Sequence, residues 1–251
     1  MEKFIVQIYE IQTPDEAEKL IEIGVDHIGS VLLSESEWKV PSVKDTIQIV
    51  AQSDSKSSLI PLFNTPETIF RVLEYYQPDI VHFCENLADR NKIFGITERL
   101  ITLQESVKEK FPQIRIIRSI PIAQKGMAEQ IPSLEIAKMF EPCSDFFLTD
   151  TLILSSSQPV EGFVGITGKT CDWDVAAKLV KQSNIPVILA GGLSPDNVHE
   201  GILHTHPAGA DTCTATNSRD DKGNLIRFKK DLAKVRHFVE ECRKTTAHSS
   251  F

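Results

Sequence analysis

Eight short apolar segments alternate with eight segments of helical pattern along the chain of 251 residues. Each apolar segment has the length and composition of a strand buried on both faces, as in a parallel sheet. Eight strand–helix units of this kind close into a (β/α)8 barrel of about 250 residues, so we predict a single-domain TIM barrel over residues 1–251. Predicted strands cover residues 4–9, 25–32, 59–63, 79–84, 114–120, 145–150, 186–190 and 209–213, and predicted helices cover residues 13–24, 41–51, 65–75, 93–111, 131–140, 173–182, 195–203 and 225–243.

A repeated triplet marks the start of three of these helices. Thr13-Pro-Asp, Thr65-Pro-Glu and Ser194-Pro-Asp each follow a predicted strand. A hydroxyl group can cap a helix, proline fits its first turn, and an acid suits the positive end of its dipole. An open dinucleotide-binding sheet is disfavoured, because no G-x-G-x-x-G follows the first strand. Loops are expected at residues 53–58 and 217–223, the second flexible and on the functional face, with a frayed tail at 247–251.

The charge and the cysteines limit the class of partner and the compartment. The formal net charge of −8 disfavours a nucleic-acid or anionic-membrane surface. No apolar run approaches the roughly 20 residues that span a bilayer, and the first residues lack the apolar core and cleavage site of a signal peptide. Five scattered cysteines without a C-x-x-C pair are typical of reduced thiols. We therefore expect a cytoplasmic protein with no nucleic-acid and no membrane partner.

The segment 186–198, Pro-Val-Ile-Leu-Ala-Gly-Gly-Leu-Ser-Pro-Asp-Asn-Val, predicts an anion site. Its apolar run is followed by Gly191 and Gly192, which let the backbone turn sharply and expose its amides to a ligand. Ser194 suits the cap of the next helix, whose positive dipole end would point at the same spot. Such a strand, turn and helix N-terminus most often bind phosphate, although a turn that binds nothing is the alternative.

Asp150 is the candidate general acid. It ends the predicted strand 145–150, and the C-terminal ends of barrel strands form the active-site face. A carboxyl group at that place is partly removed from water, which raises its pKa and lets it donate a proton. A helix cap or a loop hydrogen bond is the alternative role for this side chain.

Alternation along the strands groups further candidates. Asp211 and Cys213 share one face of the eighth predicted strand, and Thr214 and Ala215 follow with a hydroxyl group and amides for the phosphate site. His82 and Cys84 likewise share a face of the fourth strand, and Gln7 and Tyr9 a face of the first. If these faces point inward, the barrel mouth holds Tyr9, His82, Cys84, Arg118, Asp150 and Asp211.

Two further patterns are less specific. Gly168 lies in the loop of residues 165–170, which offers backbone donors and the cation of Lys169 but lacks the full P-loop spacing. Nucleotide binding is therefore not expected, and a loop without a ligand is the alternative. His82, Cys84 and an aspartate have the donor types of a zinc site, but a buried His–Asp hydrogen bond is the commoner arrangement. We predict no metal and no other cofactor.

Five motifs fit a known family, and the three in the last third of the chain also occur in its order and at similar intervals. They are Val25-Asp-His-Ile-Gly-Ser-Val31, Pro78-Asp-Ile-Val-His82, Gly168-Lys-Thr-Cys-Asp-Trp173, Pro186-Val-Ile-Leu-Ala-Gly-Gly-Leu-Ser-Pro-Asp-Asn-Val198 and Pro207-Ala-Gly-Ala-Asp211. On these motifs the chain resembles phosphoribosylanthranilate isomerase, the barrel enzyme of tryptophan synthesis. That family converts a phosphoribosyl aminoaldose to an aminoketose by an Amadori rearrangement: an acid protonates the ring oxygen, and a base removes a proton from the neighbouring carbon.

The resemblance implies roles for several residues. Asp150 stands at the place of the family's acid, and Gly191 and Gly192 match the first of its two phosphate-binding turns. The second turn carries Cys213-Thr-Ala where the family usually has Ser-Ser-Gly. A small phosphorylated sugar is therefore the implied ligand, with the phosphate site in the C-terminal quarter of the chain.

The base is the main departure from the family. The family's first strand reads Lys-x-Cys-Gly, with the cysteine as base, whereas this chain has Gln7-Ile-Tyr-Glu. The phenol of Tyr9, with an ordinary pKa near 10, is a poor base at neutral pH. Cys84 replaces the family's histidine on the fourth strand, and Trp38 or Lys39 replaces its arginine after the second.

Two classes of function are compatible with this pattern. The protein is either an enzyme on a phosphosugar, the isomerase with a relocated base such as Cys84 or Glu10 or a different reaction, or a binding module that has lost turnover. A homodimer is possible in either class. The predicted catalytic residues are Asp150, Cys84 and Tyr9, and the predicted substrate- and phosphate-binding residues are Gly168, Gly191, Gly192, Asp211, Cys213, Thr214 and Ala215.

Overall fold

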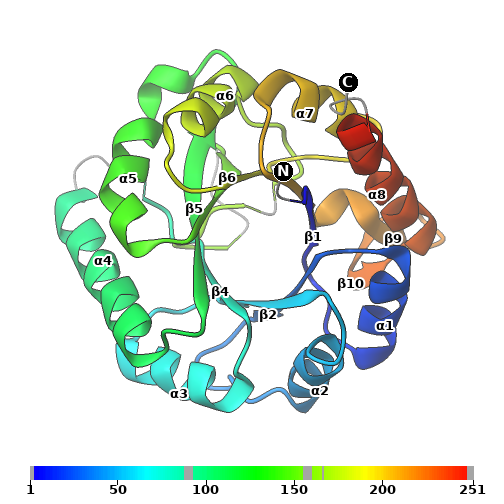
Figure 1. The fold of residues 1–251 in the computed structure, drawn as a ribbon, viewed down its shortest axis with the longest axis horizontal. Coiled ribbons are helices and arrows are strands. Elements are labelled where there is room, and N and C mark those ends of the chain that lie inside the picture. The colour runs from blue at the N-terminus through cyan, green and yellow to red at the C-terminus, as the bar shows by residue number, and fades with distance from the viewer. Residues whose placement is uncertain (1–2, 88–92, 155–159, 166, 248–251) are drawn as a thin grey trace.

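Eight parallel strands form a closed barrel in the computed structural model, which describes residues 3–87, 93–154, 160–165 and 167–247. The strands follow the order of the chain, and β8 pairs with β1 to close the ring. Helices surround the barrel (Figure 1), so the predicted TIM barrel is confirmed. The strands are β1 Ile5–Ile8, β2 His27–Leu32, β3 Lys56–Pro61, β4 Ile80–Phe83, β5 Arg115–Ala123, β6 Phe146–Leu152, β7 Val187–Leu189 and β8 Gly209–Thr212, and the helices are α1 Pro14–Ile23, α2 Pro41–Val50, α3 Pro66–Tyr76, α4 Ile93–Lys110, α5 Ser133–Phe140, α6 Trp173–Gln182, α7 Val198–Thr205 and α8 Leu232–Ala247.

Alternate residues of each strand face the helices or the barrel interior. Val6 and Ile8 of β1 belong to one buried cluster with Leu20 of α1 and Phe238 of α8. Burial of such apolar side chains between the sheet and the helices is the main favourable contribution to folding. The opposite faces of the strands line the interior of the barrel, where polar side chains accompany the apolar ones.

A cluster of four hydrogen-bonded polar side chains lies in the barrel interior. The hydroxyl of Tyr9 lies 2.6 Å from Ser58 Oγ and 2.8 Å from His82 Nδ1, and His82 Nε2 lies 2.8 Å from Ser119 Oγ. All four side chains are buried. Because each polar atom has a partner, these groups are accommodated in the interior without the cost of an unmade hydrogen bond.

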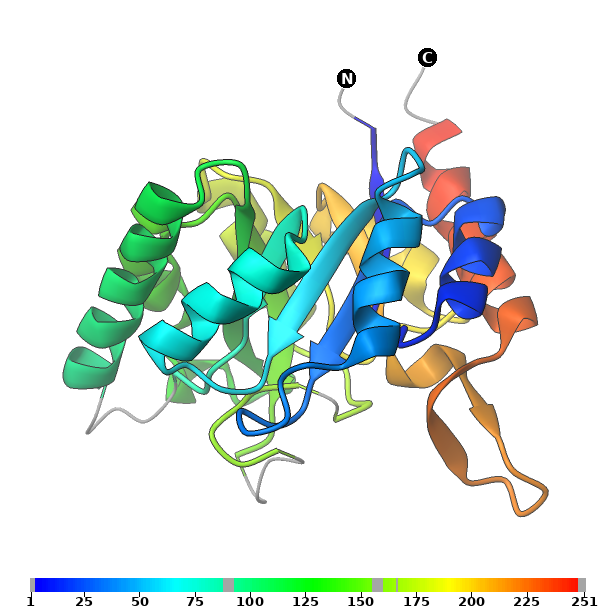
Figure 2. The ribbon, with the colours of Figure 1, turned by 90° about the horizontal axis from the view of Figure 1, so that it is seen from below.

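A hairpin replaces the predicted loop at 217–223 and the start of the predicted helix at 225–243. Strands β9, Asn217–Arg219, and β10, Leu225–Lys230, pair antiparallel, and α8 begins only at Leu232. Residues 225–230 alternate between more and less exposed side chains, which is a strand pattern rather than a helical one. Figure 2 shows the hairpin projecting from the end of the barrel to which the strands point.

The turn of this hairpin is held by local hydrogen bonds. Asp220 Oδ1 accepts from the amides of Lys222 and Asn224, at 2.9 and 2.8 Å. Asp231 then accepts from the amide of Ala233 at 3.1 Å and caps α8. The hairpin therefore ends at Lys230 and the helix begins at Leu232, so the prediction of a single helix over 225–243 was wrong.

Some predicted boundaries also differ from the structure. β3 begins at Lys56, inside the expected loop 53–58, and β6 continues two residues past Asp150 to Leu152. α7 begins at Val198 rather than at residue 195, because the Asn197 side chain accepts from the Ser194 amide and donates to the Gly192 carbonyl, which holds a turn.

The predicted prolines do lie in the first turn of α1 and α3, but the Thr13 and Thr65 side chains make no capping hydrogen bond. α8 extends through Ala247, so the first residue of the expected tail is helical, and residues 248–251 lie outside the described part of the chain. Within the described residues, none of the helices has both the length and the apolar content needed to cross a membrane.

The ring of Tyr9 lies against Gly29 of β2, and this contact generates a stability prediction. A Cβ atom at Gly29 would lie 2.0 Å from Tyr9 Cδ1, so Gly29→Ala must displace a fully packed ring. We expect a loss of about 1–3 kcal/mol in the free energy of unfolding, measured by urea denaturation. The double variant Gly29→Ala/Tyr9→Leu should lose less than the sum of the single variants, whereas additive losses would contradict the contact.

Candidate functional site

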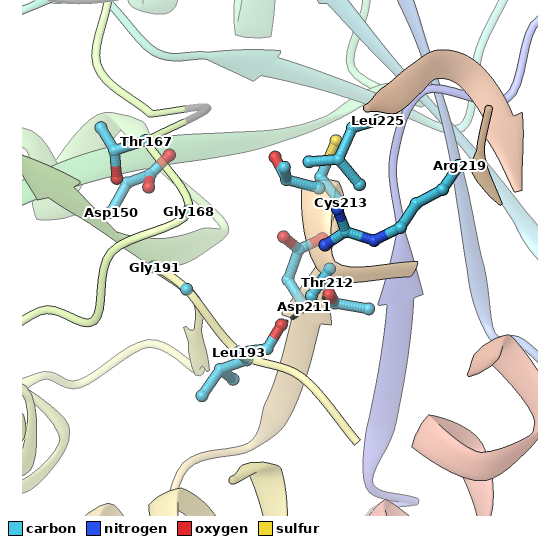
Figure 3. A pocket seen from close by; sticks show the side chains of 13 residues that line it. Asp150, Thr167, Gly168, Gly191, Leu193, Asp211, Thr212, Cys213, Arg219 and Leu225 are labelled. Carbon is cyan, nitrogen blue, oxygen red and sulfur yellow. Dashed lines mark hydrogen bonds between the residues drawn. The ribbon is translucent and has the colours of Figure 1, made fainter. Parts of the chain in front are cut away.

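A cavity of about 240 Å³ opens at the C-terminal face of the barrel (Figure 3). It lies between the loops that follow β6, β7 and β8 and the β9–β10 hairpin. All seven residues predicted to bind substrate or phosphate line it, together with Asp150. The lining residues are Asp150, Thr167, Gly168, Gly191, Gly192, Leu193, Asp211, Thr212, Cys213, Thr214, Ala215, Arg219 and Leu225.

The two glycines after β7 are required by the local backbone. Gly191 and Gly192 have φ of +87° and +64°, in the left-handed region that favours glycine. A Cβ atom at Gly192 would lie 2.4 Å from the carbonyl carbon of Lys169, and one at Gly191 would lie 2.4 Å from Thr151 Oγ1. The loop after β6 therefore packs directly on this turn, and the turn contributes backbone rather than side chains to the cavity wall.

Arg219 is the cationic side chain among the described residues that line this cavity. It comes from β9, and Figure 3 shows its guanidinium extending from the hairpin toward Cys213 and Asp211. Nη1 donates to the carbonyl of Gly223 at 2.6 Å, which leaves other donors of the guanidinium for a ligand. The cavity thus joins backbone turns with one positive charge, an arrangement suited to a phosphate group.

The hairpin is anchored to the end of β1. The buried carboxylate of Glu10, a residue with φ of +68°, accepts from Arg227 Nε at 2.8 Å and from Asn217 Nδ2 at 3.3 Å. Lys230 Nζ donates to Asn217 Oδ1 and to the Cys213 carbonyl. These contacts fix the hairpin, and with it Arg219, over the turn that follows β8.

A second, mostly apolar pocket adjoins the first. Phe163 and Val164 cover one side of it, and a β-bridge between Phe163 and Glu85 holds this loop over the end of β4. Three side chains line both pockets: Asp150, Asp211 and Cys213. A ligand that occupies both pockets must therefore pass these three groups.

Asp150 has the ionisation expected of a proton donor. Burial raises the pKa of its carboxyl to about 7, although its Oδ1 accepts from the Thr151 amide at 2.8 Å, a bond that lowers the pKa. Gly165 lies against the carboxyl, since a Cβ atom there would be 2.2 Å from Oδ2. The protonated form is thus substantially populated at neutral pH.

Tyr9 and Cys84 lie in the barrel mouth as predicted from strand alternation, on the wall of the apolar pocket. Burial raises the pKa of both groups well above their ordinary values. The Tyr9 hydroxyl is also held in the interior by Ser58 and His82. At neutral pH both groups are protonated, so neither is suited to accept a proton, and catalytic roles for them stay predictions.

Arg118 does not lie in the mouth, so that expectation was wrong. Its neighbour Ser119 takes the inward position on β5 and bonds to His82, which turns Arg118 outward. There its guanidinium donates to Glu85 Oε2 and to Gln104 Oε1, each at 2.6 Å, and is buried. Alternation fixes which residues share a face, but not which face points inward.

Two other side chains considered for the site also lie away from it. Trp38 packs edge-on against Tyr75 and Tyr76 of α3, and Lys39 lies over the Trp38 ring. In the described part of the chain, no group of three histidine, cysteine or acidic residues could hold a metal ion. The lining residues that were not predicted are Thr167, Leu193, Thr212, Arg219 and Leu225. The strand pattern of 225–230 was the signal available for Leu225.

Arg219 generates a prediction about anion affinity. A charge-assisted hydrogen bond contributes about 1.5–3 kcal/mol, so Arg219→Gln should weaken ribose 5-phosphate binding roughly 10- to 100-fold in isothermal titration calorimetry. Lys222→Gln is the matched control, because it removes a positive charge from the exposed turn of the same hairpin without lining the cavity. Equal affinities for the two variants would contradict the assignment.

The chain is similar to known proteins in both sequence and structure. The family model described as N-(5'-phosphoribosyl)anthranilate (PRA) isomerase matches residues 104–241. N-(5'-phosphoribosyl)anthranilate isomerase 2 of Methanosarcina mazei is 36% identical over 143 residues, which cover 54% of this chain and 58% of that relative. The isomerase of Methanosarcina acetivorans is 27% identical over 212 residues, covering 83% of this chain and 74% of the relative.

Solved structures give the same fold. Monomers of the dimeric phosphoribosylanthranilate isomerase of Thermotoga maritima align with a TM-score of 0.68 and 20% identity, covering 96% of this chain and 100% of that chain. A phosphoribosylanthranilate isomerase in complex with reduced 1-(o-carboxyphenylamino)-1-deoxyribulose 5-phosphate aligns with a TM-score of 0.65 and 19% identity, covering 96% and 100%. At 19–20% identity, this likeness shows a shared barrel fold and nothing further.

Proposed function

This chain belongs to the phosphoribosylanthranilate isomerase family, and on that premise we propose that it isomerises N-(5'-phosphoribosyl)anthranilate by an Amadori rearrangement. The observation that carries the proposal is the place of Asp150. Its carboxyl, with a pKa raised to about 7, lies where a cavity suited to phosphate meets an apolar pocket. A phosphorylated sugar joined to an aromatic ring has both parts that such a site would accept.

The phosphate would lie against the turns after β7 and β8. Gly192, Thr214 and Ala215 line this cavity, and their amides donate no hydrogen bond to the described residues. The guanidinium of Arg219 adds the positive charge that a dianion needs beside two carboxyl groups. The aromatic part of the substrate would occupy the apolar pocket, where burial of its ring against Phe163 favours binding.

Asp150 would act on the ribose ring between these two subsites. It donates its proton to the ring oxygen, the bond from that oxygen to the nitrogen-bearing carbon breaks, and the nitrogen lone pair forms a C=N⁺ bond. A base then removes the proton from the next carbon, which gives an enolamine. Transfer of a proton to the nitrogen-bearing carbon and loss of the hydroxyl proton yield the aminoketose. No redox partner or cofactor takes part in these steps.

Turnover is tested by adding the protein to N-(5'-phosphoribosyl)anthranilate and following the loss of the substrate's fluorescence. Loss of a general acid costs about 10²- to 10⁴-fold in rate, so Asp150→Asn should lower kcat by that factor. Its affinity for ribose 5-phosphate should stay within about threefold of the wild-type value, because asparagine has nearly the same shape as aspartate. Binding without turnover by the wild-type protein would indicate a binding module instead.

We also propose a homodimer and a cytoplasmic location. The scattered cysteines support a reducing compartment, and the similar enzyme of Thermotoga maritima is described as dimeric. Sedimentation equilibrium should give twice the chain mass, and the chain mass alone would contradict the dimer.

A further inference from the structure

The proposed reaction needs a base, and the first strand does not supply one. The resemblance implies that Tyr9 replaces the family's cysteine base, and its hydroxyl is hydrogen-bonded to Ser58 and His82 in the barrel interior. We propose that Asp211 is the general base, taking the proton from the ribose carbon next to the nitrogen-bearing carbon. This inference rests on the proposed isomerisation.

The position of Asp211 follows from the way the barrel closes. β8 pairs with β1, and Asp211 lies opposite Gln7 in that pairing. Its side chain is 7% exposed and lines both pockets, as Asp150 does. Figure 3 shows the two carboxyl groups on opposite sides of the opening. A ribose ring between the pockets would therefore face an acid from β6 and a base from β8.

A short chain of hydrogen bonds orients the Asp211 carboxylate. Gln7 Nε2 donates to Asp211 Oδ1 at 3.1 Å, and Gln7 Oε1 lies 3.0 Å from His27 Nδ1. Burial lowers the pKa of His27 to about 4, so the ring is neutral and can donate its Nδ1 proton to Gln7. The amide is thereby fixed with its NH2 group toward Asp211. Within the described residues, the Asp211 carboxylate accepts this one hydrogen bond through Oδ1, and its side chain lines both pockets.

The other groups near this position are less suited to take up a proton. Cys213 also lines both pockets, but burial raises the pKa of its thiol far above neutrality. Glu10 lines the apolar pocket, but Arg227 binds its carboxylate through two nitrogens and Asn217 through a third. Asp211 instead receives its hydrogen bond from a neutral amide, which orients the carboxylate without a paired cation.

The pair of aspartates also predicts a pH dependence. Burial raises the pKa of Asp150 to about 7. Burial, together with the negative charge of Asp150, raises the pKa of Asp211 to about 8. Such a pair titrates as a unit and holds one proton between about pH 7 and 8. Catalysis needs that proton on Asp150 and the ionised form of Asp211, and this is the minor of the two singly protonated forms because Asp211 has the higher pKa. Both singly protonated forms rise and fall together with pH, so kcat should be maximal in this range and fall on both sides. The titratable and charged groups around the pair are His27, Tyr9, Glu10, His82, Cys84, Cys171, Cys213, Arg219 and Lys230.

Three measurements on the full chain test the assignment. Asp211→Asn should lower kcat about 10²- to 10⁴-fold while ribose 5-phosphate binds within about threefold of its wild-type affinity. In Asp211→Ala, added formate should restore turnover at least tenfold with saturation, because it replaces the missing carboxylate. In Asp211→Glu, substrate deuterated at the reacting carbon should give a larger isotope effect than in the wild-type protein, since proton removal becomes slower.

The matched control is Asp15→Asn, an exposed acid in the first turn of α1 that lines neither pocket, and it should keep the wild-type kcat. A folded Asp211→Asn variant with kcat within tenfold of the wild-type value would overturn the assignment. So would an unchanged isotope effect in Asp211→Glu together with no formate rescue, since a purely substrate-binding role would give that result. Absence of turnover by the wild-type protein would instead overturn the proposed function and the base with it.

Discussion

Two carboxyl groups are buried near one another at the opening of the barrel, and the rest of the site depends on how they are kept there. Burial favours the neutral form of Asp150 and of Asp211, and the negative charge of Asp150 further disfavours a charge on Asp211. Their raised pKa values lower the stability of the folded chain as the pH rises from about 4 toward 8. A fold selected for stability alone would replace such a pair with apolar side chains. The proton transfers that we propose for the pair would offset this cost in stability through function.

The surrounding structure holds this pair in a fixed geometry. The closure of the barrel between β8 and β1 places Gln7 against Asp211, and the loop after β6 packs on the turn at Gly192. The hairpin adds a cation at the edge of the cavity, and Glu10 ties that hairpin back to β1. Each of these contacts joins segments far apart in the sequence, so the site forms only when the whole barrel has closed.

Strand alternation and turn chemistry account for the part of the site that could be predicted from the sequence. Gly191 and Gly192 directly follow a short apolar run and precede a helical pattern, which predicts a turn at the end of a strand. Asp150 likewise ends a second apolar run, which predicts a position at the C-terminal end of another strand. The inward direction of a strand, by contrast, depends on its neighbours. Arg118 and Ser119 are both polar, and the sequence does not say which of them meets His82 inside the barrel.

The hairpin was missed for a different reason. Residues 225–230 have the alternation of a strand, but they run directly into the helical pattern of α8, and a single helix covers both patterns almost as well. The anchoring ion pair between Glu10 and Arg227 joins positions 217 apart in sequence, which no local pattern reveals. Arg219 was therefore assigned to a flexible loop rather than to the cavity wall.

The most direct test of the account is a crystal structure of this protein with a phosphorylated product analogue. We predict that the phosphate lies at Gly192, Thr214 and Ala215 and that the ring oxygen or its hydroxyl equivalent lies within hydrogen-bond distance of Asp150. A carboxylate oxygen of Asp211 should lie about 3–3.5 Å from the carbon that loses its proton. A phosphate bound elsewhere, or an Asp211 carboxylate turned away from that carbon, would contradict it.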